Sequence, residues 1–170
     1  MHSFRLSRPW LLVATLLVAS AAHAENLDGT YENTGSLVSS ATAQPAGTIS
    51  FQGLLDLNFD YALTRALHAT TNRVVITQTA THLRVECRDI DDKMTWSGSW
   101  EKGTGFTLEE DHVDLVFRAP RLKDDGYLFT LRTVHDRDLL LVDVQRVNAT
   151  SFGPAAQPIG SFLFGRIAGE

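Results

Sequence analysis

From Arg73 to the C-terminus, apolar and polar side chains alternate with a period of two, and this alternation restricts the possible folds most. The run His82–Arg88, for example, places Leu83, Val85 and Cys87 on one face and its charged and polar residues on the other. Successive side chains of a β-strand point to opposite faces, so this pattern predicts strands that are buried on one side. No helical pattern interrupts the alternation after Arg73.

Short polar or glycine-containing segments separate the alternating runs and predict antiparallel hairpins. Turns are expected at 101–105, 123–126 and 135–138, and a longer polar loop at 148–158. We therefore predict an all-β fold, a single antiparallel barrel or sandwich of about eight strands. Besides His82–Arg88, the predicted strands are Arg73–Thr79, Lys93–Trp100, a short run from Phe106, His112–Arg118, Tyr127–Val134, Leu139–Val147 and Gly160–Ile167.

The segment 39–72 fits no single pattern. Residues 39–48 have the composition of a loop, 55–63 alternate like a strand, and 61–69 space their apolar residues like a short helix. Periodicity alone does not choose between the last two alternatives. We expect one short helix or irregular segment near residues 50–70, covering one end of the barrel.

The N-terminus predicts a secretory signal peptide over residues 1–24. Arg5 and Arg8 precede an apolar run from Trp10 to Ala22, and Ala22-His-Ala24 is a small-residue cleavage motif. The apolar run is shorter than the roughly 20 residues that a membrane-spanning helix needs. We expect cleavage after Ala24, a periplasmic or secreted location, no remaining membrane span, and a single β-rich domain at 25–170. An uncleaved anchor or a buried N-terminal helix is the alternative.

Charge and cysteine content narrow the classes of partner. Removal of Arg5 and Arg8 leaves 13 basic against 20 acidic residues, a formal charge of −7 with neutral histidines. Nucleic acid and anionic lipid both require a basic surface, so neither is an expected partner, whereas the charge is compatible with a basic envelope protein as well as with a small apolar ligand. Cys87 is the only cysteine, so the fold contains no internal disulfide, and its place in the alternation predicts a core residue.

Two short clusters of histidine and acidic residues are the candidates for metal binding or hydrolysis. Converging carboxylates and imidazoles can ligate a metal, but the same residues are ordinary in hairpin turns. The chain has no Gly-x-Ser-x-Gly motif for a nucleophilic serine. We therefore assign no catalytic residue, expect no cofactor, and keep as weak metal candidates only His112, Asp114, His135 and Asp138.

Aromatic residues are numerous on the predicted inner faces and could either line a pocket or fill a core. Small barrels may be hollow or solid with the same alternation, so the sequence leaves both open. Tyr31, Trp96 and Trp100 are the candidate ligand-binding residues. The run Lys93–Trp100 places on one face Met94, Trp96, Gly98 and Trp100.

Two stretches, LDGTYENTGS (27–36) and TWSGSW (95–100), resemble parts of calycin-type barrels. Lipocalins begin their first strand with Gly-x-Trp, and avidin-like proteins with Gly-Thr-Trp followed by Asn and Ser. Here Tyr31 takes the aromatic position, and Asn33 and Ser36 are one residue closer together than in the avidin pattern, so the resemblance does not imply biotin binding. The layout of the whole chain is similar to that of uncharacterised proteobacterial envelope proteins, which implies a small β-barrel in the envelope.

These observations lead to three functional hypotheses. The first is an exported, non-catalytic binding or envelope-interaction domain that holds a small apolar ligand in a β-barrel. The second is an acidic protein-interaction module, for example an inhibitor of a basic envelope hydrolase. The third, a hydrolase or metal-binding protein, rests only on the histidine and aspartate clusters.

Overall fold

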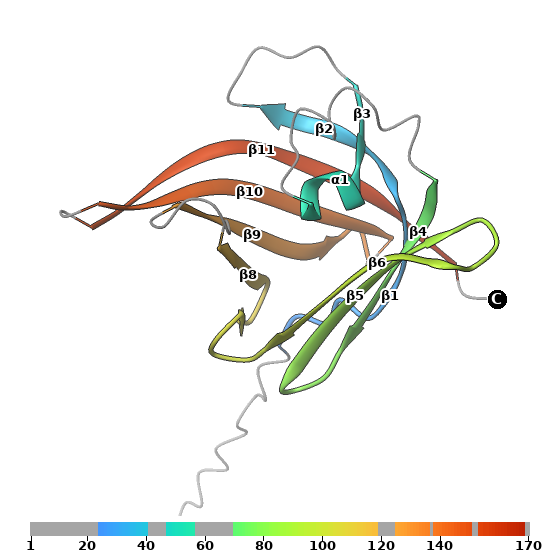
Figure 1. The fold of residues 1–170 in the computed structure, drawn as a ribbon, viewed down its shortest axis with the longest axis horizontal. Coiled ribbons are helices and arrows are strands. Elements are labelled where there is room, and N and C mark those ends of the chain that lie inside the picture. Colours follow the sequence, from blue (N-terminus) through green and yellow to red (C-terminus); the bar gives the residue numbers. More distant parts are fainter. Residues whose placement is uncertain are drawn as a thin grey trace, which may run out of the picture.

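The computed structural model describes residues 24–40, 47–56, 70–118, 125–136, 138–150 and 153–168, and these form a nearly all-β fold. One small helix and eleven strands of a single sheet make up the described part (Figure 1). The elements are β1 (Gly29–Glu32), β2 (Thr34–Ser40), β3 (Thr48–Ser50), α1 (Phe51–Leu55), β4 (Thr71–Gln78), β5 (His82–Asp89), β6 (Met94–Glu101), β7 (Phe106–Leu108), β8 (Val113–Arg118), β9 (Asp125–Val134), β10 (Leu139–Thr150) and β11 (Gly153–Ile167).

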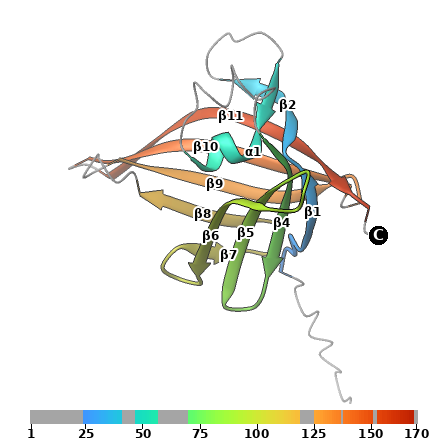
Figure 2. The same ribbon diagram turned by 45° about the vertical axis from the view of Figure 1, so that its right-hand side comes forward.

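The sheet is antiparallel, strongly curved and open. Its strands follow the order β6-β5-β4-β1-β11-β10-β9-β8-β7, while β2 pairs with β11 and with β3 beside this path. The two ends of the path, β6 and β7, approach each other without closing a barrel (Figure 2). A hydrogen bond from the Val116 amide to the Gly105 carbonyl, 3.0 Å long, joins β8 to the turn that follows β6. The all-β prediction is confirmed, in its open, sandwich-like form.

The hairpins β4–β5, β5–β6 and β9–β10 form where the alternation predicts them. In the turn between β9 and β10, His135 and Asp136 have φ angles of 52° and 56°. Two consecutive residues with positive φ give the turn a twist that matches the flanking strands. Histidine and aspartate adopt this conformation more readily than β-branched residues do.

The predicted loop at 148–158 is wrong. Strands β10 and β11 remain paired as far as Thr150 and Gly153, so this segment extends the longest hairpin of the sheet. The register shifts where Val144 pairs with Gly160 and the next pair is Gln145 with Pro158, which leaves Ile159 as the additional residue of a bulge. Glycine and proline normally indicate loops, but a bulge accommodates proline within a sheet.

The expected face of Met94 is also wrong. Cys87 pairs with Trp96, but the next pair is Arg88 with Met94, so Thr95 is an extra residue in β6. The extra residue reverses the alternation on its N-terminal side, while Trp96 and the residues after it keep their predicted faces. Met94 consequently lies on the outer face and is 55% exposed.

The difficult segment 39–72 contains the short helix that was expected near residues 50–70. Leu55 ends this helix, and the remainder of the strand and helix alternatives at 57–69 lies outside the described residues. The predicted signal peptide lies outside them too, except for Ala24. In the part of the chain that the structure describes, no helix has both the length and the apolar character needed to cross a membrane.

The core lies on the concave side of the sheet, where α1 packs inside the curve. Phe51 of α1 packs edge-on against Phe164 of β11, with ring centroids 4.7 Å apart. The largest fully buried side chains come from every part of the described chain, among them Tyr31, Phe51, Phe106, Phe129, Phe162 and Phe164. One continuous core therefore holds the domain together.

Asn33, between β1 and β2, fixes α1 against the sheet. Its side-chain oxygen accepts a hydrogen bond from the backbone amide of Gln52 at 2.9 Å. Its side-chain nitrogen donates to Ser50 Oγ and to the Thr71 carbonyl, both at 3.2 Å. Ser50 in turn caps the helix by accepting from the Gly53 amide at 3.2 Å. Asn33 is 1% exposed, so these partners replace the water that its amide loses on burial.

Candidate ligand-binding site

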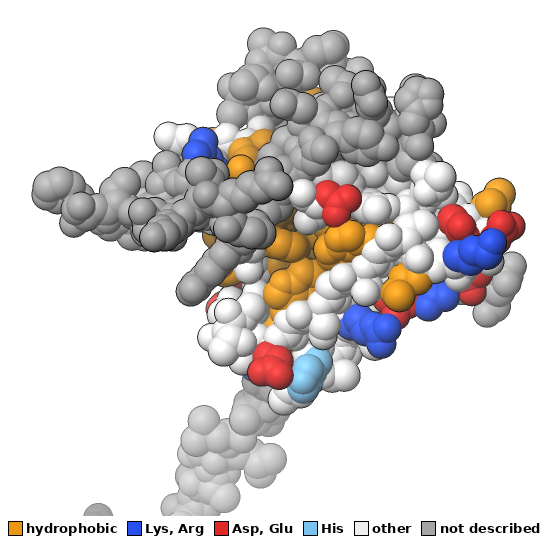
Figure 3. All heavy atoms as spheres, in the orientation of Figure 1, with side chains coloured by type: hydrophobic (Ala, Val, Ile, Leu, Met, Phe, Trp, Pro, Cys, Tyr) orange, Lys and Arg blue, Asp and Glu red, His pale blue; other side chains and the backbone are white. Residues whose placement is uncertain are grey.

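Three half-buried rings line the gap between β6 and β8, and we call them the aromatic strip: Trp96, Trp100 and Phe117. The ring centroids of Trp96 and Trp100 are 6.3 Å apart, and those of Trp100 and Phe117 are 5.2 Å apart. Phe117 continues inward to the buried ring of Phe129 at 4.7 Å. Figure 3 shows hydrophobic side chains gathered on this face of the molecule. The strip thus connects the core to the surface.

Two glycines leave the space that the indoles occupy. A Cβ atom on Gly98 would lie 2.4 Å from Trp100 Cη2 and 2.7 Å from Trp96 Cη2. A Cβ on Gly105 would lie 2.8 Å from Trp100 Cδ1. The glycine at Gly103 serves a different purpose, because its φ of 84° suits the turn and nothing lies near it. The spacing Trp-Ser-Gly-Ser-Trp therefore sets both rings over one glycine.

Asp56 lies beside the strip at the C-terminal end of α1. Its backbone amide donates to the Gln52 carbonyl at 2.9 Å, which ends the helix. Partial burial of its carboxyl group raises the pKa of Asp56, and hydrogen bonding from the side chains of Gln52 and Trp96 acts in the opposite direction. Sequence reasoning missed this residue, because no local pattern around it predicts its neighbours.

Hydroxyl groups of β4 and β6 orient the Gln52 side chain. Its Oε1 atom accepts hydrogen bonds from Thr71 Oγ1 and from Thr95 Oγ1, the latter at 3.3 Å. The Thr71 and Thr95 hydroxyls are themselves 2.7 Å apart. Because the amide oxygen is occupied in this way, the amide nitrogen is the part of Gln52 that can donate to Asp56.

Cys87 is a core residue, as its place in the alternation predicts, with 0% exposure. Burial, and to a smaller extent the charge of Asp56, raises the pKa of the thiol from 9.0 to about 12. At mildly alkaline pH the fraction of Cys87 present as thiolate in the folded protein is then about a thousandfold lower than that of a free cysteine. The thiolate is the nucleophilic form, so the folded protein should react slowly with alkylating reagents.

We expect iodoacetamide to leave Cys87 unmodified in the native protein and to alkylate it in guanidinium chloride, as measured by mass spectrometry. Because the raised pKa favours the neutral thiol, its contribution to stability is complete below pH 9.0 and is lost as the pH rises toward about 12. Equal alkylation rates in the two solvents would contradict the burial of the thiol.

Tyr31, the third candidate for ligand binding, lies apart from the strip. Its side chain is 0% exposed, and its hydroxyl donates to the Leu27 carbonyl at 2.9 Å. The guanidinium group of Arg166 lies 5.8 Å from the centre of its ring. These contacts give Tyr31 a structural role at the start of β1, and we do not include it in the site.

The histidine and aspartate candidates are not assembled into one cluster. His112 Nδ1 lies 2.7 Å from Asp111 Oδ1, and its Nε2 lies 3.8 Å from Asp114 Oδ2. Hydrogen bonding to Asp111 raises the pKa of His112. His135 and Asp138 are exposed in the turn between β9 and β10. Among the described residues, no group of three or more histidine, cysteine or acidic side chains is placed to hold a metal ion.

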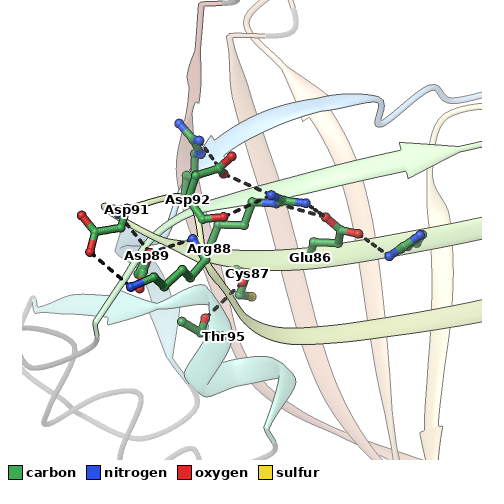
Figure 4. A network of polar contacts seen from close by, with 10 residues as sticks. Glu86, Cys87, Arg88, Asp89, Asp91, Asp92 and Thr95 are labelled. Carbon is green, nitrogen blue, oxygen red and sulfur yellow. Dashed lines mark hydrogen bonds and ion pairs between the residues drawn. The ribbon is translucent and has the colours of Figure 1, made fainter.

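A second polar feature, the network in Figure 4, covers the outer face of β4 and β5. Asp92 contacts Arg73 at 2.6 Å and Arg88 at 3.2 Å, and Glu86 contacts Arg88 and Arg84, both at 2.5 Å. Arg73 and Arg88 lower the pKa of Asp92 by hydrogen bonding. A hollow of about 390 Å³ lies beside Arg73 and Arg88. Because both arginines already contact carboxylates, this network satisfies its own charges and stabilises the turn between β5 and β6.

Comparison with known protein families, with curated proteins and with solved structures finds no match for this chain. The resemblance to calycin-type barrels stays a prediction from the sequence. The residues and geometry described above are therefore the basis for the function proposed below.

Proposed function

We propose that this protein is an exported, non-catalytic binding domain that holds a ligand with an apolar body against the aromatic strip. The proposed location, periplasmic or secreted after cleavage at Ala24, rests on the N-terminal sequence motif. The proposed ligand class rests on one observation, the half-buried run of Trp96, Trp100 and Phe117 that leads from the surface to the core.

The strip differs from the buried phenylalanines of the core in its exposure. Phe51, Phe106 and Phe129 are each 1% exposed, whereas the three rings of the strip are only partly covered. Aromatic surface left in contact with water loses the roughly 25 cal/mol per Å² that burial provides. A contiguous apolar strip at the surface is typical of a binding site, and an apolar ligand would recover this free energy.

Tryptophan fluorescence provides a direct test. The chain has three tryptophans, and Trp10 lies in the proposed signal peptide, so protein prepared from Glu25 onward has only the two indoles of the strip as reporters. We expect a saturable blue shift of their emission when the protein is titrated with 1-octanol, an uncharged apolar probe. Absence of a saturable change would contradict the proposal.

Phe117→Ala in the same protein, prepared from Glu25 onward, should weaken 1-octanol binding about tenfold, which corresponds to roughly 1.4 kcal/mol. Val116→Ala is the matched control, because Val116 precedes Phe117 in β8 but is 48% exposed on the opposite face. Circular dichroism should show that both variants remain folded. Equal effects of the two substitutions would exclude the strip as the binding surface.

A further inference from the structure

A hollow of about 360 Å³ lies on the outer face of the sheet and shares no lining residue with the aromatic strip. We call it the outer hollow. In β9, β10 and β11, Thr130, Asp143 and Ser161 alternate with buried core residues, so their side chains point away from the core. Five polar side chains and one proline ring line the outer hollow, and they belong to Ser39, Thr130, Asp143, Gln145, Pro158 and Ser161.

Four of the polar side chains form a row across neighbouring strands. The row runs through the register pairs Ser39–Ser161, Ser161–Asp143 and Asp143–Thr130. Neighbouring strands lie about 4.8 Å apart, so a ligand of a few carbon atoms can reach the polar groups of two or three strands at once. The sheet thus presents regularly spaced hydrogen-bonding groups to one small ligand.

Two β-bulges meet at the outer hollow and account for it. Ile159 is the extra residue of β11 against β10, and Val38 is the extra residue of β2 against β11. A bulge bends its strand and increases the local twist, which opens space that a regular pleated face does not have. Bulges are over-represented next to active sites, where they redirect side chains. The outer hollow is therefore built into the strand pairing.

The hydroxyl groups of the outer hollow supply both a donor and an acceptor. Ser39 Oγ donates to Ser161 Oγ at 3.1 Å, which leaves the hydroxyl hydrogen of Ser161 for a ligand. Thr130 Oγ1 donates to Asp114 Oδ1 at 2.6 Å, so its oxygen remains an acceptor.

Asp143 and Gln145, two residues apart in β10, add a carboxylate and an amide. The Asp143 carboxylate is 27% exposed and lies 3.7 Å from the Arg132 guanidinium, which compensates the charge at a distance too long for a hydrogen bond. Among the described residues, the Gln145 amide forms no hydrogen bond, so it presents two donors and an acceptor. A ligand that both donates and accepts, and that carries no charge of its own, matches these groups.

We infer that the outer hollow binds a sugar ring, whose neighbouring hydroxyl groups hydrogen-bond to Asp143, Gln145 and Ser161. The apolar C–H face of the ring packs on Pro158, which is exposed. Each sugar hydroxyl is at once a donor and an acceptor, whereas an anion would use only the donors and a cation would compete with Arg132 for Asp143. A volume of about 360 Å³ is at the small end of ligand pockets, which suits a single ring. This site is additional to the apolar site proposed above.

Saturation-transfer NMR on protein prepared from Glu25 onward tests the inference. The probes are glucose, galactose and N-acetylglucosamine, their methyl glycosides, and tetrahydropyran-2-methanol, a similar ring without neighbouring hydroxyls. We expect at least one sugar to bind saturably, and tetrahydropyran-2-methanol to bind at least about tenfold more weakly. Added salt should leave sugar binding nearly constant, because screening acts on charges. A glycoside that binds as well as its free sugar would identify the ligand as a unit of a glycan, and loss of binding on methylation would identify a free sugar.

Asp143→Ala should weaken sugar binding about tenfold, because it removes a charged acceptor, and Gln145→Ala should weaken it about fivefold. Asp91→Ala is the matched control. It also removes a carboxylate with a long ion pair, 3.8 Å to Lys93, but it lies in the turn between β5 and β6, outside the outer hollow. The control should leave sugar binding unchanged, and all three variants should bind 1-octanol as the unaltered protein does.

Sugar binding that is lost in Asp143→Ala and kept in Asp91→Ala would support the inference. Absence of saturable binding by every sugar would overturn it and leave the proposed apolar site unaffected. Equal binding of tetrahydropyran-2-methanol, or equal effects of Asp143→Ala and Asp91→Ala in folded proteins, would also overturn it. If Asp143→Ala fails to fold by circular dichroism, Gln145→Ala decides between these outcomes.

Discussion

Replacing Asn33 with alanine is expected to lower the free energy of unfolding by about 3–5 kcal/mol. The substitution removes the Asn33 side chain as the hydrogen-bond partner of the Gln52 backbone amide, the Thr71 carbonyl and the Ser50 hydroxyl. A buried polar group that loses its partner costs about 1–3 kcal/mol. Since domains of this size are stable by about 5–15 kcal/mol, the loss would be a large part of the total.

Urea unfolding followed by circular dichroism measures this effect. Asn72→Ala is the matched control, because Asn72 lies next to the same junction but its side chain is exposed, and its backbone carbonyl still accepts the 3.2 Å bond from the Asn33 amide. We expect the control to change stability by less than about 0.5 kcal/mol. Similar stabilities of the two variants would show that the Asn33 side chain does not hold α1 to the sheet.

Gly35→Ala is expected to destabilise the protein by about 3 kcal/mol, at the upper end of the cost of overpacking. A Cβ atom at this position would lie 2.4 Å from the Leu163 carbonyl oxygen and 2.5 Å from Phe164 Cδ1. The carbonyl belongs to β11, which pairs with β2 at this point, so it cannot move without disturbing the ladder. Phe164 is buried in the core and has little room to rotate.

Thermal and urea unfolding of Gly35→Ala should be compared with those of Gly103→Ala. Gly103 has a φ of 84° and no atom near the position of a Cβ, so its replacement adds only backbone strain of about 1 kcal/mol. The difference between the two variants isolates the steric contribution. If Gly35→Ala were as stable as the unaltered protein, the close approach of β2 and β11 would be incorrect.

The strands that follow Arg73 were largely predictable, because alternation within a strand is a local property. The pattern assigned Trp96 and Trp100 to one face and Cys87 to the core, and these assignments match the structure. The pattern failed at Met94, beside a bulge at Thr95, and at 148–158, where the ladder of β10 and β11 continues beyond a bulge at Ile159. A bulge depends on the partner strand, so alternation in one strand contains no information about it.

The site was predictable only in part. Trp96 and Trp100 were candidates from the sequence, but Asp56 was not, and Phe117 was only one of many aromatic residues that could fill a core. Asp56 and Trp96 are separated by 40 positions in the chain, and the curvature of the sheet brings α1 to β6. Tyr31, a ligand-binding candidate from the sequence, donates to the Leu27 carbonyl, and Asn33 joins the sheet to α1, contacts that no local pattern predicts.

The sequence by itself determined the β-rich class, the buried face of most strands and the turns that allow hairpins, because each depends on neighbouring residues and on the two-residue repeat of a strand. Tertiary structure alone decided that the sheet stays open, that Phe117 meets Trp100 across the gap between β6 and β8, and that Asp56 has no basic partner among the described residues. The physical reason is that these features depend on how far a long, twisted sheet curves, and curvature accumulates over many strands.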